Sequence, residues 1–107
     1  MNINFPSNRL IQEDLRAQFN CYDVIMKRSY FKSCAINNDG HLIISGYALY
    51  VYYDAELNED VYMVVDFTFN TFNIEMEIGD DFLGDGFETL DEAHEFTMKA
   101  ENLKIVN

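Results

Sequence analysis

Two neighbouring stretches of this chain alternate apolar and polar side chains with a period of two residues, and this pattern restricts the fold most. Odd-numbered residues are apolar throughout Val61–Phe69, and even-numbered residues are apolar throughout Phe72–Ile78. Because successive side chains of a strand point to opposite faces, each stretch predicts a β-strand with one apolar face. The register slips by one between them, which indicates either a tight turn at Asn70-Thr71 or a bulge in one long strand. We favour the turn.

The segment before these strands predicts a hairpin. Asn37-Asn38-Asp39-Gly40 is a strong turn signal because Asp-Gly suits positive φ, and it separates predicted strands at about 29–36 and 41–53. The second of these is apolar on both faces apart from Ser45 and Gly46, so we expect a central strand with a bulge at Gly46. The polar, acidic segment Asp54–Asp60 then connects to the next strand.

Helices are predicted at the two ends of the chain. Ser7 is a suitable N-cap for a helix near 8–19, and Thr89 with Glu92 forms a capping box for a second helix near 90–102. Residues 80–86 (DDFLGDG) are expected to form a loop. The inward-facing residues of the two helices are expected to be Ile11, Leu15 and Phe19 in the first, and Leu90, Ala93, Phe96, Thr97 and Ala100 in the second.

The order of elements predicts a single α+β domain over residues 1–107. We expect an antiparallel sheet of three to four strands, with an N-terminal and a C-terminal helix packed on one face. The chain is 49% hydrophobic with nine Phe and seven Tyr, which favours one packed core over a disordered acidic chain. Cys21 and Cys34 are expected to be reduced core residues. No apolar run reaches 18 residues, so we expect a soluble, cytoplasmic protein.

Charge is distributed very unevenly along the chain. The 66 residues from Ser33 to Met98 contain no Lys or Arg and hold 15 of the 19 acidic residues, and the net charge is −12. Direct nucleic-acid binding is excluded because it requires a basic patch. Net charge this far from zero bears on partners and solubility rather than on fold.

The acidic residues give little support to a metal site. Asp81, Asp85, Gly86 and Glu92 fall at positions 1, 5, 6 and 12 of an EF-hand loop, but position 3 is Leu83, which donates no oxygen ligand. We interpret this segment as an acidic turn leading into a capped helix. His41 and His94 have no His or Cys partner at ligand spacing, so neither a metal nor another cofactor is predicted.

Catalysis has equally weak support. Asp66, Glu75 and Glu77 lie on adjacent predicted strands, as the carboxylates of two-metal nucleases do, but the basic residues that stabilise charge on phosphate are missing from this part of the chain. We interpret them as the solvated face of the sheet. No GxSxG, phosphate-loop or Cys/His signature occurs, and His94 is expected at the boundary of the core. We therefore predict a protein that is not an enzyme.

The acidic surface is the remaining candidate for a function. Regularly placed carboxylates on a rigid scaffold can imitate a phosphate backbone and occupy a groove lined with Lys and Arg. The alternative is that the charge serves solubility alone. The Tyr cluster at 47–62 could add interface anchors, although sheet packing also accounts for it. The predicted partner-binding residues are Glu75, Glu77, Asp80, Asp81, Asp85, Asp91, Glu92 and Glu95.

The acidic clusters DAELNED (54–60), EMEIGDD (75–81) and ETLDEAHE (88–95), within a segment free of Lys and Arg, give the chain a resemblance to a known type of protein. In size, charge and layout it resembles the small acidic inhibitors of phages and mobile elements, of the anti-CRISPR and DNA-mimic anti-restriction type. The resemblance implies a non-catalytic inhibitor that blocks the nucleic-acid channel of a basic nucleic-acid-binding protein, such as a CRISPR effector or restriction nuclease. We expect a monomer or small homo-oligomer. The alternatives are an immunity or antitoxin protein against a basic nuclease toxin, and a small acidic metal-binding or hydrolytic domain using His94.

Overall fold

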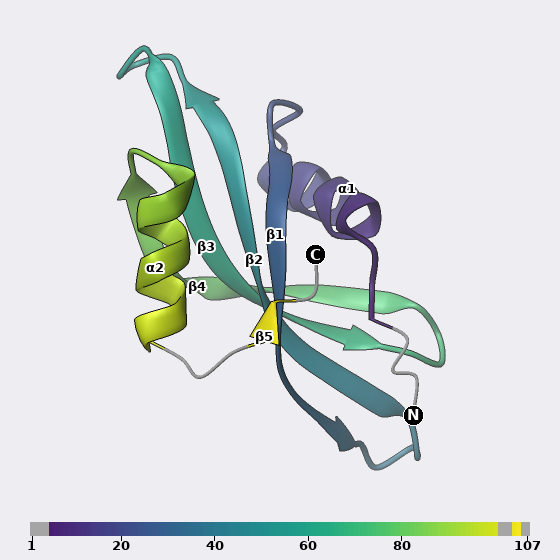
Figure 1. Cartoon of the computed structure of the whole chain (residues 1–107). Helices are drawn as coiled ribbons and strands as arrows, with labels where there is room; N and C mark the ends of the chain where they lie inside the picture. Colours follow the sequence, from purple (N-terminus) through teal and green to yellow (C-terminus); the bar gives the residue numbers. More distant parts are fainter. Residues whose placement is uncertain (1–4, 101–103, 106–107) are drawn as a thin grey trace.

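One antiparallel sheet organises the molecule, with its strands in the order β4-β3-β2-β1-β5 (Figure 1). The computed structural model describes residues 5–100 and 104–105, except for the side chains of residues 80–85 and 104–105. The predicted α+β class and single domain are confirmed. The elements are α1 (Asn8–Phe19), β1 (Ile25–Ile36), β2 (Leu42–Asp54), β3 (Glu59–Asn70), β4 (Glu75–Phe87), α2 (Leu90–Ala100) and β5 (Lys104–Ile105).

The two helices cover opposite faces of the sheet, in contrast to the expectation that both pack on one face. Ile11 and Leu15 of α1 belong to a core cluster with Ala48 and Tyr50 of β2. Ala93 of α2 belongs to a second cluster with the odd-numbered β2 residues Tyr47 and Leu49. Even and odd residues of a strand point to opposite sides, so α1 and α2 lie on either side of β2 (Figure 1). A central strand that is apolar on both faces requires cover on both.

The predicted first helix is confirmed with its boundaries. The Ser7 side chain accepts a hydrogen bond from the backbone N–H of Leu10, and Asn20 ends the helix in the left-handed conformation at φ 51°. Ile11 and Leu15 are completely buried, whereas Phe19 is partly buried at the end of the stripe. The amphipathic pattern therefore fixes the packing of α1 against the sheet.

The second helix follows its predicted cap. The Thr89 hydroxyl accepts a hydrogen bond from the Glu92 backbone N–H at 3.1 Å. Ala93 and Thr97 are buried, but Phe96 remains 41% exposed, so the inward stripe is narrower than predicted. Residues 101 and 102 of the predicted helix lie outside the described residues.

Strand β4 corrects the expectation of a loop at residues 80–86. This segment pairs with β3, including Val65 with Phe82 and Val64 with Gly84. Three register shifts let β4 use four more residues than β3 between the Asn70–Glu75 pair and its other end. The Gly and Asp residues that suggested a loop are accommodated by these irregularities in an edge strand, so the loop prediction is wrong.

The bulge expected at Gly46 lies in the neighbouring strand instead. The register of β1 against β2 shifts between Phe31 and Ser33, which places the extra residue, Lys32, in β1. Gly46 is needed for close approach, because a Cβ there would collide with the Tyr30 carbonyl and press on the Phe67 ring. The prediction that β2 is central is confirmed.

Residues 61–78 form a hairpin, as predicted, but its loop is longer than Asn70-Thr71. The β3–β4 and β2–β3 loops both place four residues between the last strand pair, and in each the side chain of Asn70 or Asp54 accepts two backbone N–H groups at 2.9–3.3 Å. The fourth loop residue has positive φ in both, Asn58 at 56° and Ile74 at 62°. A β-branched residue is strained there, whereas Asn tolerates this conformation.

This comparison of the two loops generates a stability prediction. The substitution Ile74→Asn should raise the free energy of unfolding by about 1 kcal/mol, because it removes the strain of a β-branched residue in the left-handed backbone conformation. The Ile74 side chain is already 53% exposed. Urea unfolding measures the change. The matched control is Ile36→Asn, at a 65% exposed position inside β1. That substitution should not stabilise, since Asn is disfavoured in strands. A lower unfolding free energy for Ile74→Asn would contradict the prediction.

Candidate functional site

The fold separates the charges across the sheet. Lys27, Arg28 and Lys32 lie on β1, which is next to one edge, whereas Glu75 and Glu77 lie on β4, the strand at the other edge. The sequence order alone, with basic residues near both ends of the chain, does not specify this arrangement. The sheet order therefore converts a sequence asymmetry into an acidic side of the molecule.

The first acidic area lies on the part of the sheet that α2 leaves open. Glu75 and Glu77 are exposed and pair with Asn70 and Thr68 on the neighbouring strand, and Asp66 lies further along the same face of β3. Glu77 lines two neighbouring hollows, one shared with Asp66 and the other with Glu75. We call this the open sheet surface, made of Asp66, Thr68, Asn70, Glu75 and Glu77.

The backbone of β4 makes room for the carboxylate of Asp66. Gly79 lies beside it, and a Cβ at that position would collide with the Asp66 side chain. The absence of a side chain at Gly79 therefore lets the Asp66 carboxylate lie against the strand. The predicted solvated face of Asp66, Glu75 and Glu77 is confirmed, since all three are exposed.

The second acidic area is on α2. Asp91, Glu92 and Glu95 are exposed, and we call them the α2 surface. Asp91 and Glu92 occupy the first turn, where negative charge interacts favourably with the helix dipole. Asp91 and Glu95 are four residues apart, where like charges destabilise a helix slightly. Glu95 lies beyond the first turn, so its charge gains no stabilisation from the helix dipole.

The structure splits the predicted acidic array in two. The open sheet surface is at the start of β4, whereas α2 follows the end of β4, at the opposite side of the view in Figure 1. Asp80, Asp81 and Asp85 lie between them in the backbone of β4, and their side chains fall outside the described residues. Of the five predicted residues whose side chains are described, Glu75 and Glu77 therefore lie on the open sheet surface, and Asp91, Glu92 and Glu95 lie on the α2 surface.

These exposed carboxylates have no compensating cations among the described residues. The ion pair within that part of the chain joins Arg9 and Glu13 of α1 at 3.5 Å, and both side chains are largely exposed. No described cation comes within ion-pair distance of Glu75, Glu77, Asp91, Glu92 or Glu95. Their charge is therefore available to a partner, subject to screening by salt.

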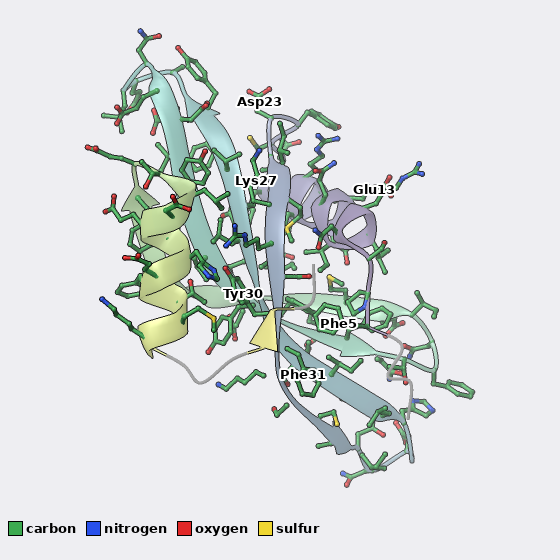
Figure 2. The ribbon with its side chains drawn as sticks, viewed as in Figure 1. Phe5, Glu13, Asp23, Lys27, Tyr30 and Phe31 are labelled. Atoms are coloured by element: carbon green, nitrogen blue, oxygen red, sulfur yellow. The ribbon has the colours of Figure 1, made fainter. Side chains whose placement is uncertain are left out.

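The two histidines are held by contacts within the fold. His94 of α2 is partly buried, and its Nδ1 lies 2.8 Å from the hydroxyl of Tyr30. Tyr30 is a fully buried residue of β1, and it is labelled in Figure 2. His41 stacks on Phe72 with ring centroids 4.3 Å apart, and its Nδ1 lies 3.1 Å from the Asn70 side-chain nitrogen. The expected boundary position of His94 is confirmed.

The partial EF-hand spacing does not fold as an EF-hand loop. Asp81 and Asp85 lie within β4, which continues as far as Phe87, whereas a calcium loop must turn sharply at Gly86 after a helix. Among the residues whose side chains are described, no group of three or more His, Cys, Asp or Glu could hold a metal ion.

The two cysteines differ from the expectation of buried core residues. Cys34 is exposed on β1 and Cys21 is partly exposed after α1, and both are free thiols. Cys21 lines an apolar cavity with Tyr50, and no sequence pattern predicted this cavity. Tyr50 lies in a strand that is apolar on both faces, so no alternation pattern distinguishes it from its neighbours.

Comparisons with protein-family models, with curated proteins and with solved structures found no match to this chain. Within the described residues, no helix is long and apolar enough to cross a membrane.

The Tyr30–His94 contact generates a pH prediction. Burial raises the pKa of Tyr30, and the nearby Arg28 guanidinium offsets only part of this effect. Because the folded pKa is above the unfolded value near 10, the contribution of neutral Tyr30 is fully present below about pH 10 and is lost as pH rises through the folded pKa. Tyr30→Phe should therefore be less stable than the wild type by about 1 kcal/mol at pH 8, with a smaller difference above pH 10.

Urea midpoints between pH 8 and pH 11 test this prediction. The control is Tyr22→Phe, since Tyr22 is 80% exposed and should show little difference from the wild type at either pH. A Tyr30→Phe deficit that stays constant or grows with pH would contradict the assignment.

Proposed function

We propose that this chain is a non-catalytic acidic protein that binds a basic nucleic-acid-binding enzyme and blocks its nucleic-acid channel. A CRISPR effector or a restriction nuclease has the chemistry of such a partner. The main support is that Glu75, Glu77, Asp91, Glu92 and Glu95 are exposed on regular secondary structure without a described cationic partner. The proposal places the protein in the cytoplasm, where such enzymes act.

Rigid placement of the charges favours binding to a defined groove. Glu75 and Glu77 point to the same face of β4 about 7 Å apart, from two rises of about 3.4 Å, and their strand is paired with β3. Carboxylates held on a paired strand lose less conformational entropy on binding than carboxylates on a loose tail. They can therefore replace phosphates at a row of Lys and Arg side chains.

The separation of the open sheet surface from the α2 surface suggests an extended contact. A nucleic-acid channel carries basic groups along its length. Two acidic areas joined by β4 therefore fit such a channel better than they fit a single compact basic pocket. This consideration favours channel blocking over the capping of one isolated cation.

The test uses immobilised protein and a nuclease-treated lysate of the cells that encode the chain. The expected result is retention of a basic nucleic-acid enzyme at low salt and its loss at about 0.5 M salt, where screening acts within a few ångströms. Duplex DNA or RNA added at low salt should elute the same enzyme, because both ligands would occupy one channel. Retention that withstands the nucleic acid would contradict channel blocking.

Charge reversal identifies the surface involved. Replacing Glu75, Glu77, Asp91 and Glu95 by Lys should slow association with the captured enzyme at least tenfold and flatten its salt dependence. The control reverses four exposed acids outside both surfaces, with the same change in net charge: Glu13, Asp23, Asp39 and Glu56. Equal association rates for the two quadruple variants would show that net charge, rather than these surfaces, governs binding.

A further inference from the structure

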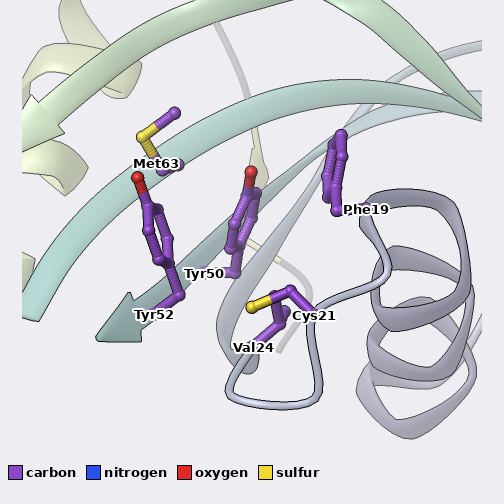
Figure 3. A pocket seen from close by; sticks show the side chains of 6 residues that line it. All are labelled: Phe19, Cys21, Val24, Tyr50, Tyr52 and Met63. Carbon is purple, nitrogen blue, oxygen red and sulfur yellow. The ribbon is translucent and has the colours of Figure 1, made fainter. Parts of the chain in front are cut away.

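An apolar cavity of about 260 Å³ lies between the end of α1 and the sheet (Figure 3). Its inner part is made by Val24, Tyr50 and Met63, which are 1%, 3% and 9% exposed. Its mouth is made by Phe19, Cys21 and Tyr52, which are only partly buried. A buried interior with a half-exposed rim gives the cavity a route to solvent.

The volume of this hollow is sufficient for a small aromatic molecule. An engineered apolar cavity of about 150 Å³ is already enough to bind benzene. The walls here include three aromatic rings, with the Phe19 and Tyr50 centroids 6.0 Å apart at 25° and the Tyr50 and Tyr52 centroids 6.5 Å apart at 33°. Flat ring faces favour a planar aromatic occupant by offset stacking.

The Tyr50 hydroxyl supplies a polar group inside this apolar site. The Tyr50 ring is almost completely buried, and no hydrogen bond joins its hydroxyl to another described residue. Burial raises the pKa of Tyr50, so the hydroxyl stays protonated and can donate. Among the described residues, the fully buried side-chain polar atoms without a partner are Asn8 Oδ1 and Ser29 Oγ. The Tyr50 hydroxyl is not one of them, so it is accessible and can donate a hydrogen bond to a bound molecule.

We propose that this cavity is a binding site for a small, neutral, planar aromatic molecule that carries one hydrogen-bond acceptor, with the Tyr50 hydroxyl as donor. The ring of the ligand lies against the aromatic walls, and its acceptor faces Tyr50. The described residues that line the cavity include no charged side chain, which favours a neutral ligand. The site faces α1, whereas the open sheet surface and α2 lie on the other side of the sheet, so this inference is independent of the proposed function.

The test compares two probes of similar shape, acetophenone, which has a carbonyl acceptor, and ethylbenzene, which has none. Each is titrated into the full chain while the ¹³C methyl resonance of Met63 reports binding in the cavity. Both probes should shift this resonance in the wild type. In Tyr50→Phe, the ratio of the ethylbenzene to the acetophenone dissociation constant should fall by about 3- to 10-fold, the value of one net hydrogen bond.

Two further variants make the result specific. Tyr22→Phe is the matched control, because Tyr22 is 80% exposed and does not line the cavity, and it should leave the ratio unchanged. Cys21→Leu adds bulk at the mouth and should weaken both probes at least fivefold. The proposal is overturned if neither probe shifts Met63 up to its solubility limit, which would indicate a cavity that holds only water, or if Tyr50→Phe leaves the ratio unchanged.

Discussion

The burial of β2 on both faces is the constraint on which the rest of the structure depends. Tyr47 and Leu49 point into one core cluster, and Ala48 and Tyr50 point into the other. A strand that is buried on both sides must be flanked by strands at both edges and covered by a layer on each face. The sheet order, with β2 in the middle, and the positions of α1 and α2 on opposite faces both follow from this requirement.

The same strand shows what could and could not be predicted from sequence. The lack of alternation in 41–53 correctly predicts a central strand, and it also implies that both faces are covered, an implication that conflicts with two helices on one face. The Asp-Gly signal correctly predicts a turn at Gly40, which has φ 80°. Local capping patterns correctly predict the helix starts at Ser7 and Thr89. Local signals of this kind are reliable because the residues that produce them act within a few positions.

The failures lie where distant parts of the chain decide the outcome. Residues 80–86 have the composition of a loop, but pairing with β3 holds them in a bulged edge strand. The open sheet surface could be predicted as a solvated face from alternation, whereas its distance from α2 could not, because it depends on the course of β4. The cavity at Tyr50 depends on how α1 and the 20–24 connection close over the sheet, which no local pattern encodes.

The acidity of β4 also has a structural consequence that is compatible with the proposed function. An edge strand exposes unpaired backbone groups, and charged side chains and bulges on it disfavour pairing with a second chain. Glu75 and Glu77, followed by the irregular pairing of 78–87, give β4 both devices. The other side of the sheet is protected differently, because β5 pairs with β1 at Tyr30 and Phe31, and a bulge at Lys32 follows directly. Protection of the β4 edge needs only a few charges, however, and it does not require Glu95 on α2 or the absence of Lys and Arg throughout residues 33–98. Edge protection therefore does not explain these additional acidic residues. The proposed binding to a basic partner gives a physical reason for their presence.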